Sequence, residues 1–310
     1  MSKSVLAISV GDLNGIGIEI ALRAHEEISK FAQPIYCISQ EMLEQACKRL
    51  DIIQPEDMIL FPVKNEFKIK PGRIDKKSGK YSYNSFKKAI KLCEKKIADG
   101  LVTLPIHKEA WSKADIDYKG HTDMLRSYFD QEAIMMLGCE KMYVALYTEH
   151  IPLSKVPQQI KTKKITRFLL DLSKDIHAHK IAVLGLNPHA GDGGVLGDEE
   201  RYISKAIKQA NKSLKKDLFI GPLVPDTAFT KAMRKQYQHY VAMYHDQGLI
   251  PLKALHFDES INISLNLPVI RTSVDHGTAF DIAYKDNNPS RKSYINAVKA
   301  AVEHIGKNQS

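Results

Sequence analysis

The sequence of 310 residues is poor in the features that mark secreted, membrane and thiolate-metal proteins. Its four cysteines, Cys37, Cys47, Cys93 and Cys139, form no Cys-x-x-Cys pair, so it has no recognisable thiolate zinc or redox motif. No apolar run approaches the ~20 residues of a membrane helix. The N-terminal segment also lacks the apolar region and cleavage site of a signal peptide, so we expect a cytoplasmic protein.

Dense basic blocks with interleaved aromatic residues are also absent, although the chain is basic. Lys and Arg (45) outnumber Asp and Glu (36), which gives a formal net charge of +9. Because the lysines are scattered in pairs, we expect no nucleic-acid or membrane partner, while an anionic small molecule is compatible with the charge. A hydrophobic content of 44% is typical of a globular chain, and the length fits two domains.

Short apolar runs alternate with longer helical patterns along the chain. This alternation predicts an α/β fold with a largely parallel sheet covered on both faces. The predicted strands cover residues 5–10, 101–106, 142–147, 181–186, 218–220, 240–244 and 267–274. The predicted helices cover residues 18–31, 85–98, 165–174, 199–215, 227–236 and 294–305.

Three histidines follow predicted strands directly: His150, His189 and His245. Ligands of open α/β sheets bind beyond the carboxyl ends of the strands, so these side chains are expected at one polar edge. Three imidazoles with open positions are typical of a catalytic divalent metal. The alternative is three separate loop histidines. Spacing alone favours three separate loop histidines. The repeated placement directly after strands counts in favour of the metal site.

Several other residues are candidates for binding an anion. Lys253, Asn262 and Arg271 have suitable chemistry, and Arg271 stands inside an apolar strand-like run where a guanidinium needs a partner. Thr122 is placed to cap a helix beginning near Asp123, and the free backbone N–H groups at such a helix start bind anions. The alternative is that Thr122 is a simple structural cap. The Gly11–Gly17 turn is not the dinucleotide fingerprint.

Six stretches together resemble the 4-hydroxythreonine-4-phosphate dehydrogenase family. They span most of the chain in order, and the last two are highly specific. The stretches are Gly11–Gly17, Gly120–Asp123, Leu186–Gly191, Gly221–Thr227, Ala242–Gly248 (AMYHDQG) and Arg271–Ala279 (RTSVDHGTA).

The resemblance implies an NAD(P)-dependent enzyme with an isocitrate/isopropylmalate dehydrogenase-like fold of two α/β/α lobes with a cleft between them. We expect residues 1–120 plus about 275–310 in the cofactor lobe and residues 121–274 in the lobe with metal, substrate and dimer contacts. The resemblance also implies a homodimer with its active site at the subunit interface.

The resemblance assigns roles to particular residues. It implies a divalent metal (zinc, magnesium or cobalt) on His150, His189 and His245, and a phosphorylated amino-acid substrate. The substrate residues are His121, Thr122, Lys253, Asn262 and Arg271, and the division of phosphate and carboxylate between Lys253 and Arg271 is open. The cofactor residues are His276, Gly277, Thr278 and Asp281. Asp246 and Lys253 are candidates for the catalytic general base by neighbourhood only.

Three other functions remain to be weighed. The first is a dehydrogenase for another phosphorylated hydroxy acid, such as a four-carbon sugar-acid 4-phosphate. The second is a phosphate acyltransferase of related fold, which predicts activity without a metal trio. The third is a non-enzymatic protein that binds a phosphate ligand or nucleic acid, indicated only by the positive charge.

Overall fold

The computed structural model describes residues 3–285 and 288–309, which divide into two compact units. Unit 1 comprises Met1–Gln131, Ile261–Ile263 and Leu267–Ser310, and unit 2 comprises Glu132–Ser260 and Ser264–Asn266. Within the described residues we find no helix with the length and hydropathy needed to cross a membrane.

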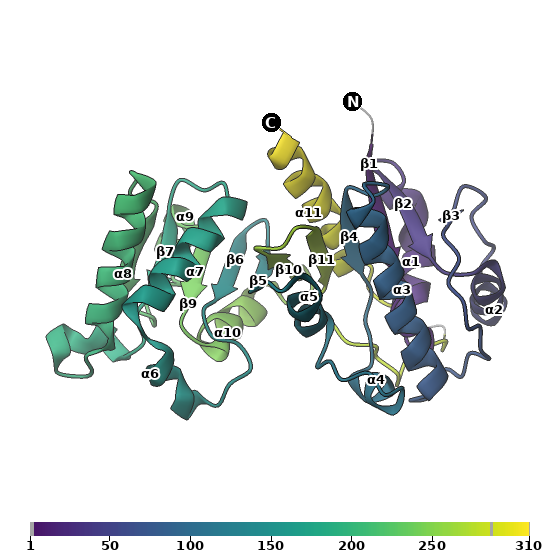
Figure 1. The fold of residues 1–310 in the computed structure, drawn as a ribbon, viewed down its shortest axis with the longest axis horizontal. Helices are drawn as coiled ribbons and strands as arrows, with labels where there is room; N and C mark the ends of the chain where they lie inside the picture. Colours follow the sequence, from purple (N-terminus) through teal and green to yellow (C-terminus); the bar gives the residue numbers. More distant parts are fainter. Residues whose placement is uncertain (1–2, 286–287, 310) are drawn as a thin grey trace. The chain divides into compact units, whose positions relative to one another are not determined.

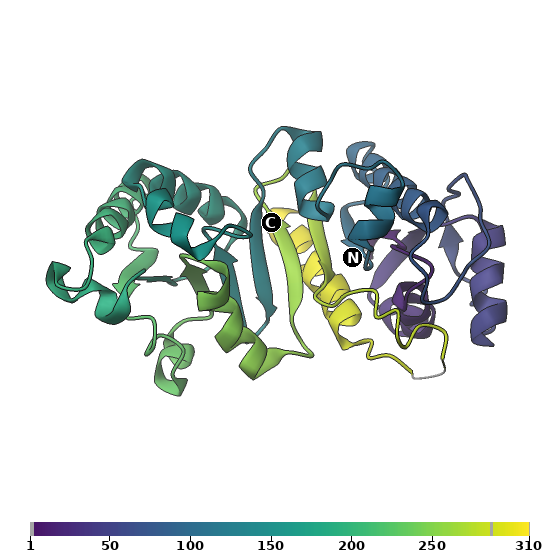
Figure 2. The same ribbon diagram turned by 90° about the horizontal axis from the view of Figure 1, so that it is seen from below.

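Unit 1 is built on a parallel sheet in the order β3-β2-β1-β4-β11, with β10 beside β11. Its strands are β1 (Ser4–Ser9), β2 (Ala32–Cys37), β3 (Ile59–Leu60), β4 (Gly100–Thr103) and β11 (Ile270–Val274), and β10 (Ile261–Leu265) contributes its first three residues. Its helices are α1 (Gly17–Ile28), α2 (Gln40–Leu50), α3 (Lys76–Glu94), α4 (Lys108–Lys113), α5 (His121–Phe129) and α11 (Lys292–Gln309). Helices α3 and α11 cover opposite faces of this sheet (Figures 1 and 2).

Unit 2 has the strand order β5-β6-β9-β7-β8. Strands β5 (Ile134–Cys139) and β6 (Met142–Leu146) form an antiparallel hairpin, and β6, β9 (His239–Ala242), β7 (Ile181–Leu184) and β8 (Phe219–Leu223) are parallel. Its helices are α6 (Val156–Gln159), α7 (Thr162–Asp175), α8 (Glu199–Leu214), α9 (Lys231–Gln236) and α10 (His245–His256). Figure 2 shows α10 on one face of this sheet and α7 and α8 on the other. Leu249 and Leu252 of α10 belong to the buried core against the strands.

The predicted alternation of strands and helices is confirmed, with some elements missed. Strands β1, β4 and β7 are almost wholly buried, as expected of strands covered on both faces. Strands β2, β3, β5 and β10 and helices α2, α4, α6 and α10 lie outside the predicted ranges. Helix α10 contains Gly248 and Pro251, and both residues have a low intrinsic helix propensity.

The two units differ from the expected lobes at their boundaries. Helix α5 belongs to unit 1, where His121 packs its ring edge-on against Phe86 and Trp111. Residues 267–274 also belong to unit 1, because β11 pairs in parallel with β4. The expected boundaries at residues 120 and 274 therefore lie inside structure that unit 1 holds together.

Candidate functional site

The three strand-end histidines follow neighbouring strands of unit 2. His150 follows β6, His245 opens α10 directly after β9, and His189 follows β7. Because β6, β9 and β7 are adjacent and parallel, their carboxyl ends lie at the same edge of the sheet. The ring centroids of His150 and His245 are 5.4 Å apart.

Side chains tie the three loops of this edge together. Thr148 Oγ1 donates to the Met243 carbonyl at 2.7 Å, which links the loop after β6 to the end of β9. Gln247 accepts from Met243 N and donates to the Gly185 carbonyl, both at 2.7 Å, which links β9 to β7. The histidine edge is therefore a hydrogen-bonded assembly of loops.

The loop that carries His189 is held by one buried carboxylate. Glu200 Oε1 accepts from Leu186 N at 2.8 Å and Asn187 N at 2.7 Å, and Oε2 accepts from Asn187 Nδ2 at 2.9 Å. His189 itself is exposed and has a left-handed backbone conformation (φ 52°). Such a conformation is costly for a residue with a side chain and persists where neighbouring contacts fix it.

The donor set at this edge fits a divalent metal. His150 and His189 are exposed, and the Nδ1 atom of His245 lies 2.7 Å from Asp246 Oδ1. In carboxylate–histidine–metal arrangements a carboxylate holds one ring nitrogen in this way and the other nitrogen binds the metal. The three imidazoles are not a closed cluster, however. Among residues 3–285 and 288–309, the one trio of His, Cys, Asp or Glu ligand atoms within 4.8 Å of one another is Cys139, His256 and Glu259. Metal binding by the three histidines stays a prediction.

Unit 1 contains a second group of predicted site residues, around a buried cation. Arg271, only 2% exposed, lies on β11 and donates to Thr103 Oγ1 through Nη2 at 2.7 Å and Nε at 3.2 Å. Burial lowers the pKa of Arg271 to about 9. A planar guanidinium matches the geometry of phosphate and carboxylate groups, which agrees with the predicted substrate role of Arg271.

Three other predicted substrate residues belong to the same unit. His121 begins α5, Thr122 beside it is buried, and Asn262 lies on β10 next to β11. Within the described part of the chain, His121 Nε2 and Asn262 Oδ1 are buried without a hydrogen-bond partner. Burial, and then the charge of Arg271, hold the pKa of His121 well below its usual value. Buried polar atoms are normally paired, so these two atoms are suited to a ligand.

The remaining substrate and base candidates lie in unit 2. The Lys253 ammonium on α10 lies 5.2 Å from the centre of the Phe257 ring. Asp246 has a side chain that is 71% exposed and contacts His245 Nδ1. In this arrangement Asp246 is placed to orient the imidazole of His245.

The predicted cofactor residues form a loop that packs on the glycine-rich first turn. The Thr278 carbonyl accepts from Ile16 N at 3.0 Å, and a Cβ on Gly15 would lie 2.6 Å from that carbonyl oxygen. The Nδ1 atom of His276 lies 3.0 Å from the Gly277 carbonyl, and Asp281 is exposed. Beside this loop is a cavity of about 460 Å³, lined by Arg49, Pro71, Gly72, Phe280, Ala283, Tyr284 and Lys285.

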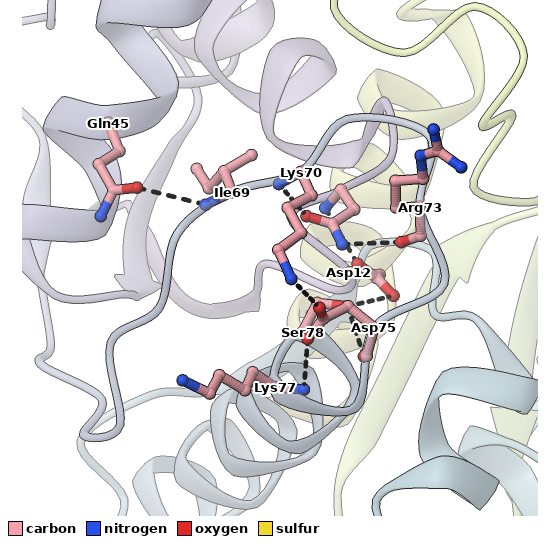
Figure 3. A network of polar contacts seen from close by, with 9 residues as sticks. Asp12, Gln45, Ile69, Lys70, Arg73, Asp75, Lys77 and Ser78 are labelled. Atoms are coloured by element: carbon pink, nitrogen blue, oxygen red, sulfur yellow. Dashed lines mark hydrogen bonds and ion pairs between the residues drawn. The ribbon is translucent and has the colours of Figure 1, made fainter.

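The same glycine-rich turn contains a buried carboxylate that the sequence analysis did not single out. Asp12 is fully buried and accepts from Asn14 N at 2.9 Å and Ser78 Oγ at 3.1 Å (Figure 3). Burial raises its pKa to about 6 in spite of these hydrogen bonds. Asn14 continues the network by donating to the Arg73 carbonyl and accepting from Lys70 N, both at 2.8 Å. Asp12 thereby ties the turn to the 70–78 segment.

Comparison with known proteins decides the family. The family model of the pyridoxal phosphate biosynthetic protein PdxA matches residues 30–301. This chain belongs to the PdxA family. A 4-hydroxythreonine-4-phosphate dehydrogenase of Sulfurimonas denitrificans is 60% identical over 302 residues, which are 97% of this chain and 98% of the relative. The resemblance inferred from the six sequence stretches is therefore confirmed.

Solved structures confirm the fold class. The crystal structure of 4-hydroxythreonine-4-phosphate dehydrogenase from Klebsiella pneumoniae superposes with a TM-score of 0.83 at 30% identity, covering 98% of this chain and 99% of that one. A β-decarboxylating dehydrogenase from Thermococcus kodakarensis shares the fold with a TM-score of 0.53 at 11% identity, covering 98% and 84% of the chains. This chain therefore has the fold of the solved 4-hydroxythreonine-4-phosphate dehydrogenases and shares it with that β-decarboxylating dehydrogenase.

Proposed function

We propose that this PdxA family member is an NAD(P)- and divalent-metal-dependent dehydrogenase. It oxidises 4-phosphooxy-L-threonine to 2-amino-3-oxo-4-phosphooxybutanoate. That product decarboxylates to 3-amino-2-oxopropyl phosphate, in the synthesis of pyridoxine 5'-phosphate. The names of its relatives and structural neighbours support the substrate.

The observation that carries the proposal is the buried anion-binding group in unit 1. Arg271 is a buried guanidinium held by Thr103, and His121 Nε2 and Asn262 Oδ1 are buried polar atoms to which the described structure gives no partner. A substrate with phosphate, carboxylate and hydroxyl groups offers hydrogen-bond partners to His121 Nε2 and Asn262 Oδ1, and its anionic groups suit the guanidinium of Arg271. Thr122 and Lys253 complete the proposed substrate contacts.

The metal and the cofactor are assigned to residues suited to hold them. His150, His189 and His245 would hold a divalent metal, which when bound supplies Lewis-acid polarisation of the substrate hydroxyl. Three imidazole donors favour zinc or cobalt over magnesium. His276, Gly277, Thr278 and Asp281 would contact the dinucleotide, whose nicotinamide accepts the hydride.

The side chains of this chain handle charge and protons. Arg271 and Lys253 neutralise the anionic ends of the substrate and fix its orientation. Oxidation breaks the C3–H bond, with the electron pair leaving as hydride, and the hydroxyl proton passes to a general base. The candidates are Asp246 and Lys253, and Lys253 can serve only as a neutral amine, in which case Arg271 alone neutralises the substrate. The β-keto carboxylate then loses CO₂ by cleavage of the C–C bond, whose electron pair forms an enolate, and a proton taken up at the enolate carbon gives the ketone product.

The proposal includes a homodimer with the active site at the subunit interface, and a cytoplasmic location. Both follow from the family resemblance and the sequence, as does the absence of nucleic-acid and membrane partners. Among the alternatives, a dehydrogenase for a four-carbon sugar-acid 4-phosphate would use the same anion-binding residues. The substrate of that enzyme would differ from 4-phosphooxy-L-threonine only in the group at C2.

An NAD(P)-coupled assay on the purified protein tests the proposal. Reduced cofactor should form from 4-phosphooxy-L-threonine and not from the sugar-acid 4-phosphate, and a chelator or His245→Ala should abolish it. Full activity of His245→Ala would contradict the metal assignment. If the wild type were inactive with every divalent metal and with both cofactors, the function itself would be wrong.

A further inference from the structure

Cys139, His256 and Glu259 bring three metal-ligand atoms together in unit 2, and the function proposed above uses none of them. The Cys139 sulfur lies 3.9 Å from Glu259 Oε2, and His256 Nδ1 lies 3.6 Å from the same oxygen. All three ligand atoms lie within 4.8 Å of one another. Cys139 is buried, and the side chains of His256 and Glu259 are 11% and 38% exposed.

The fold fixes these residues from two directions. Cys139 ends β5 and pairs with Met142 across the tight hairpin, where a Cβ on Gly138 would lie 2.1 Å from the Met142 carbonyl oxygen. His256 is the last residue of α10, which packs against β5 and β6. The backbone amide of Glu259 donates to the His256 carbonyl at 3.3 Å, which places both side chains on one turn.

We propose that Cys139, His256 and Glu259 form a zinc-binding site, distinct in its ligands from the three histidines. A tetrahedral zinc ion with ordinary bond lengths needs donor–donor separations of about 3.3–3.5 Å, so the observed 3.6 and 3.9 Å require only small side-chain adjustments. Thiolate, imidazole and carboxylate are donors that zinc accepts, and water completes the fourth position.

Binding is balanced in charge and protons. Without metal, the Cys139 thiol donates to Glu259, while Lys141 Nζ lies 3.0 and 3.2 Å from the two carboxylate oxygens. On binding, the zinc–sulfur bond replaces the S–H bond and the thiol proton leaves to solvent. The Lys141 side chain is 65% exposed, so its ammonium can move into water when zinc takes its place.

The zinc site would connect two elements that also lead to predicted substrate and metal residues of unit 2. It connects the C-terminal turn of α10, which carries Lys253, to the hairpin whose second strand leads to His150. A metal here therefore fixes the last turn of α10 against the sheet.

Cobalt substitution of the metal-stripped full-length protein tests the site independently of activity. Because the three histidines offer no sulfur, a thiolate-to-cobalt charge-transfer band reports only a cysteine ligand. We expect this band in the wild type and in Cys47→Ser, and its loss in Cys139→Ser. Cys47 is a matched control, since it is 7% exposed against 6% for Cys139.

Two further variants move the affinity in opposite directions. His256→Gln should weaken cobalt binding at least about tenfold, because even indirect partners of a metal ligand are worth that much. Lys141→Gln should tighten it, because a competing cation is removed. The proposal is overturned if the wild type shows no charge-transfer band, if Cys139→Ser keeps it, or if Lys141→Gln binds cobalt no better. None of these outcomes depends on whether the protein is a dehydrogenase.

Discussion

Arg271 and Thr103 lie on neighbouring strands, and the buried guanidinium of Arg271 donates two hydrogen bonds to the single hydroxyl of Thr103. The hydroxyl helps to fix the planar guanidinium in one orientation. A guanidinium held in this way is suited to bind a phosphate or carboxylate of the substrate proposed above.

Thr103→Val should weaken substrate binding while leaving the catalytic step largely intact. Valine keeps the shape but removes the acceptor, so the guanidinium loses its fixed orientation. We expect KM to rise about tenfold, equivalent to about 1.4 kcal/mol. Thr272→Val is the matched control. Thr272 lies on the same strand as Arg271, and its buried hydroxyl donates to the Ala297 carbonyl at 2.7 Å. If both variants change KM equally, Thr103 has only a structural role.

Asp12→Asn should stabilise the protein at neutral pH. The folded-state pKa of about 6 lies above the usual 3.8, so the wild type becomes less stable as pH rises through this range. Asparagine can accept from Asn14 N and donate to Ser78 Oγ, while Ser78 donates to the Asp75 carbonyl at 3.0 Å. We expect a gain of about 2–3 kcal/mol at pH 8 that disappears near pH 4, measured by urea unfolding.

The neighbouring Asp75 provides the opposite control. Although burial acts to raise its pKa, hydrogen bonds and the charge of Lys70 lower it overall. Asp75→Asn should therefore lose stability at pH 8, and the loss should shrink as the pH falls. If Asp12→Asn behaved in the same way, the buried Asp12 carboxylate would be a net stabilising group.

His121 should make stability fall on the acid side of neutrality. Its pKa is well below the usual 6.5, because burial and then Arg271 disfavour the imidazolium. The unfolded chain therefore binds the proton more tightly, and stability is lost as pH falls below about 6.5. Unfolding at pH 7 and pH 5 should show this loss in the wild type and less of it in His121→Gln. An equal loss in both proteins would show that His121 is readily protonated in the folded state.

Glu200→Ala should weaken metal binding by the three histidines about tenfold, because the loop carrying His189 loses its anchor. Glu200→Gln is the matched control, since Oε1 still accepts from Leu186 N and Asn187 N. Zinc competition with a chelator measures the effect, in a Cys139→Ser background that removes the second proposed site. Unchanged affinity in Glu200→Ala would show that the loop does not position a ligand.

The sequence allowed the histidine edge to be predicted because α/β topology brings strand ends together regardless of their separation along the chain. His150, His189 and His245 each follow a strand, and β6, β9 and β7 are neighbours in the sheet. The buried setting of Arg271 was likewise predictable, because a charged residue stands out in an apolar run.

Other features depend on contacts that no local pattern reveals. Thr103 ends the apolar run of β4 and gains its importance only from Arg271 on the next strand. Cys139 has no other metal-ligand residue of its trio nearby in the sequence, so its spacing indicates no metal site. The fold brings His256, at the end of α10, and Glu259 beside it. Helix α10 itself was missed because the buried side chains of Leu249 and Leu252 outweigh the local preferences of Gly248 and Pro251.

One measurement tests the central claim most directly: the stoichiometry of products from carboxyl-labelled 4-phosphooxy-L-threonine, NAD(P) and a divalent metal. A dehydrogenase followed by decarboxylation predicts one reduced cofactor and one labelled CO₂ per substrate consumed, with both lost on chelation. Consumption of the substrate without reduction of the cofactor, or no consumption under any metal and cofactor condition, would contradict the account.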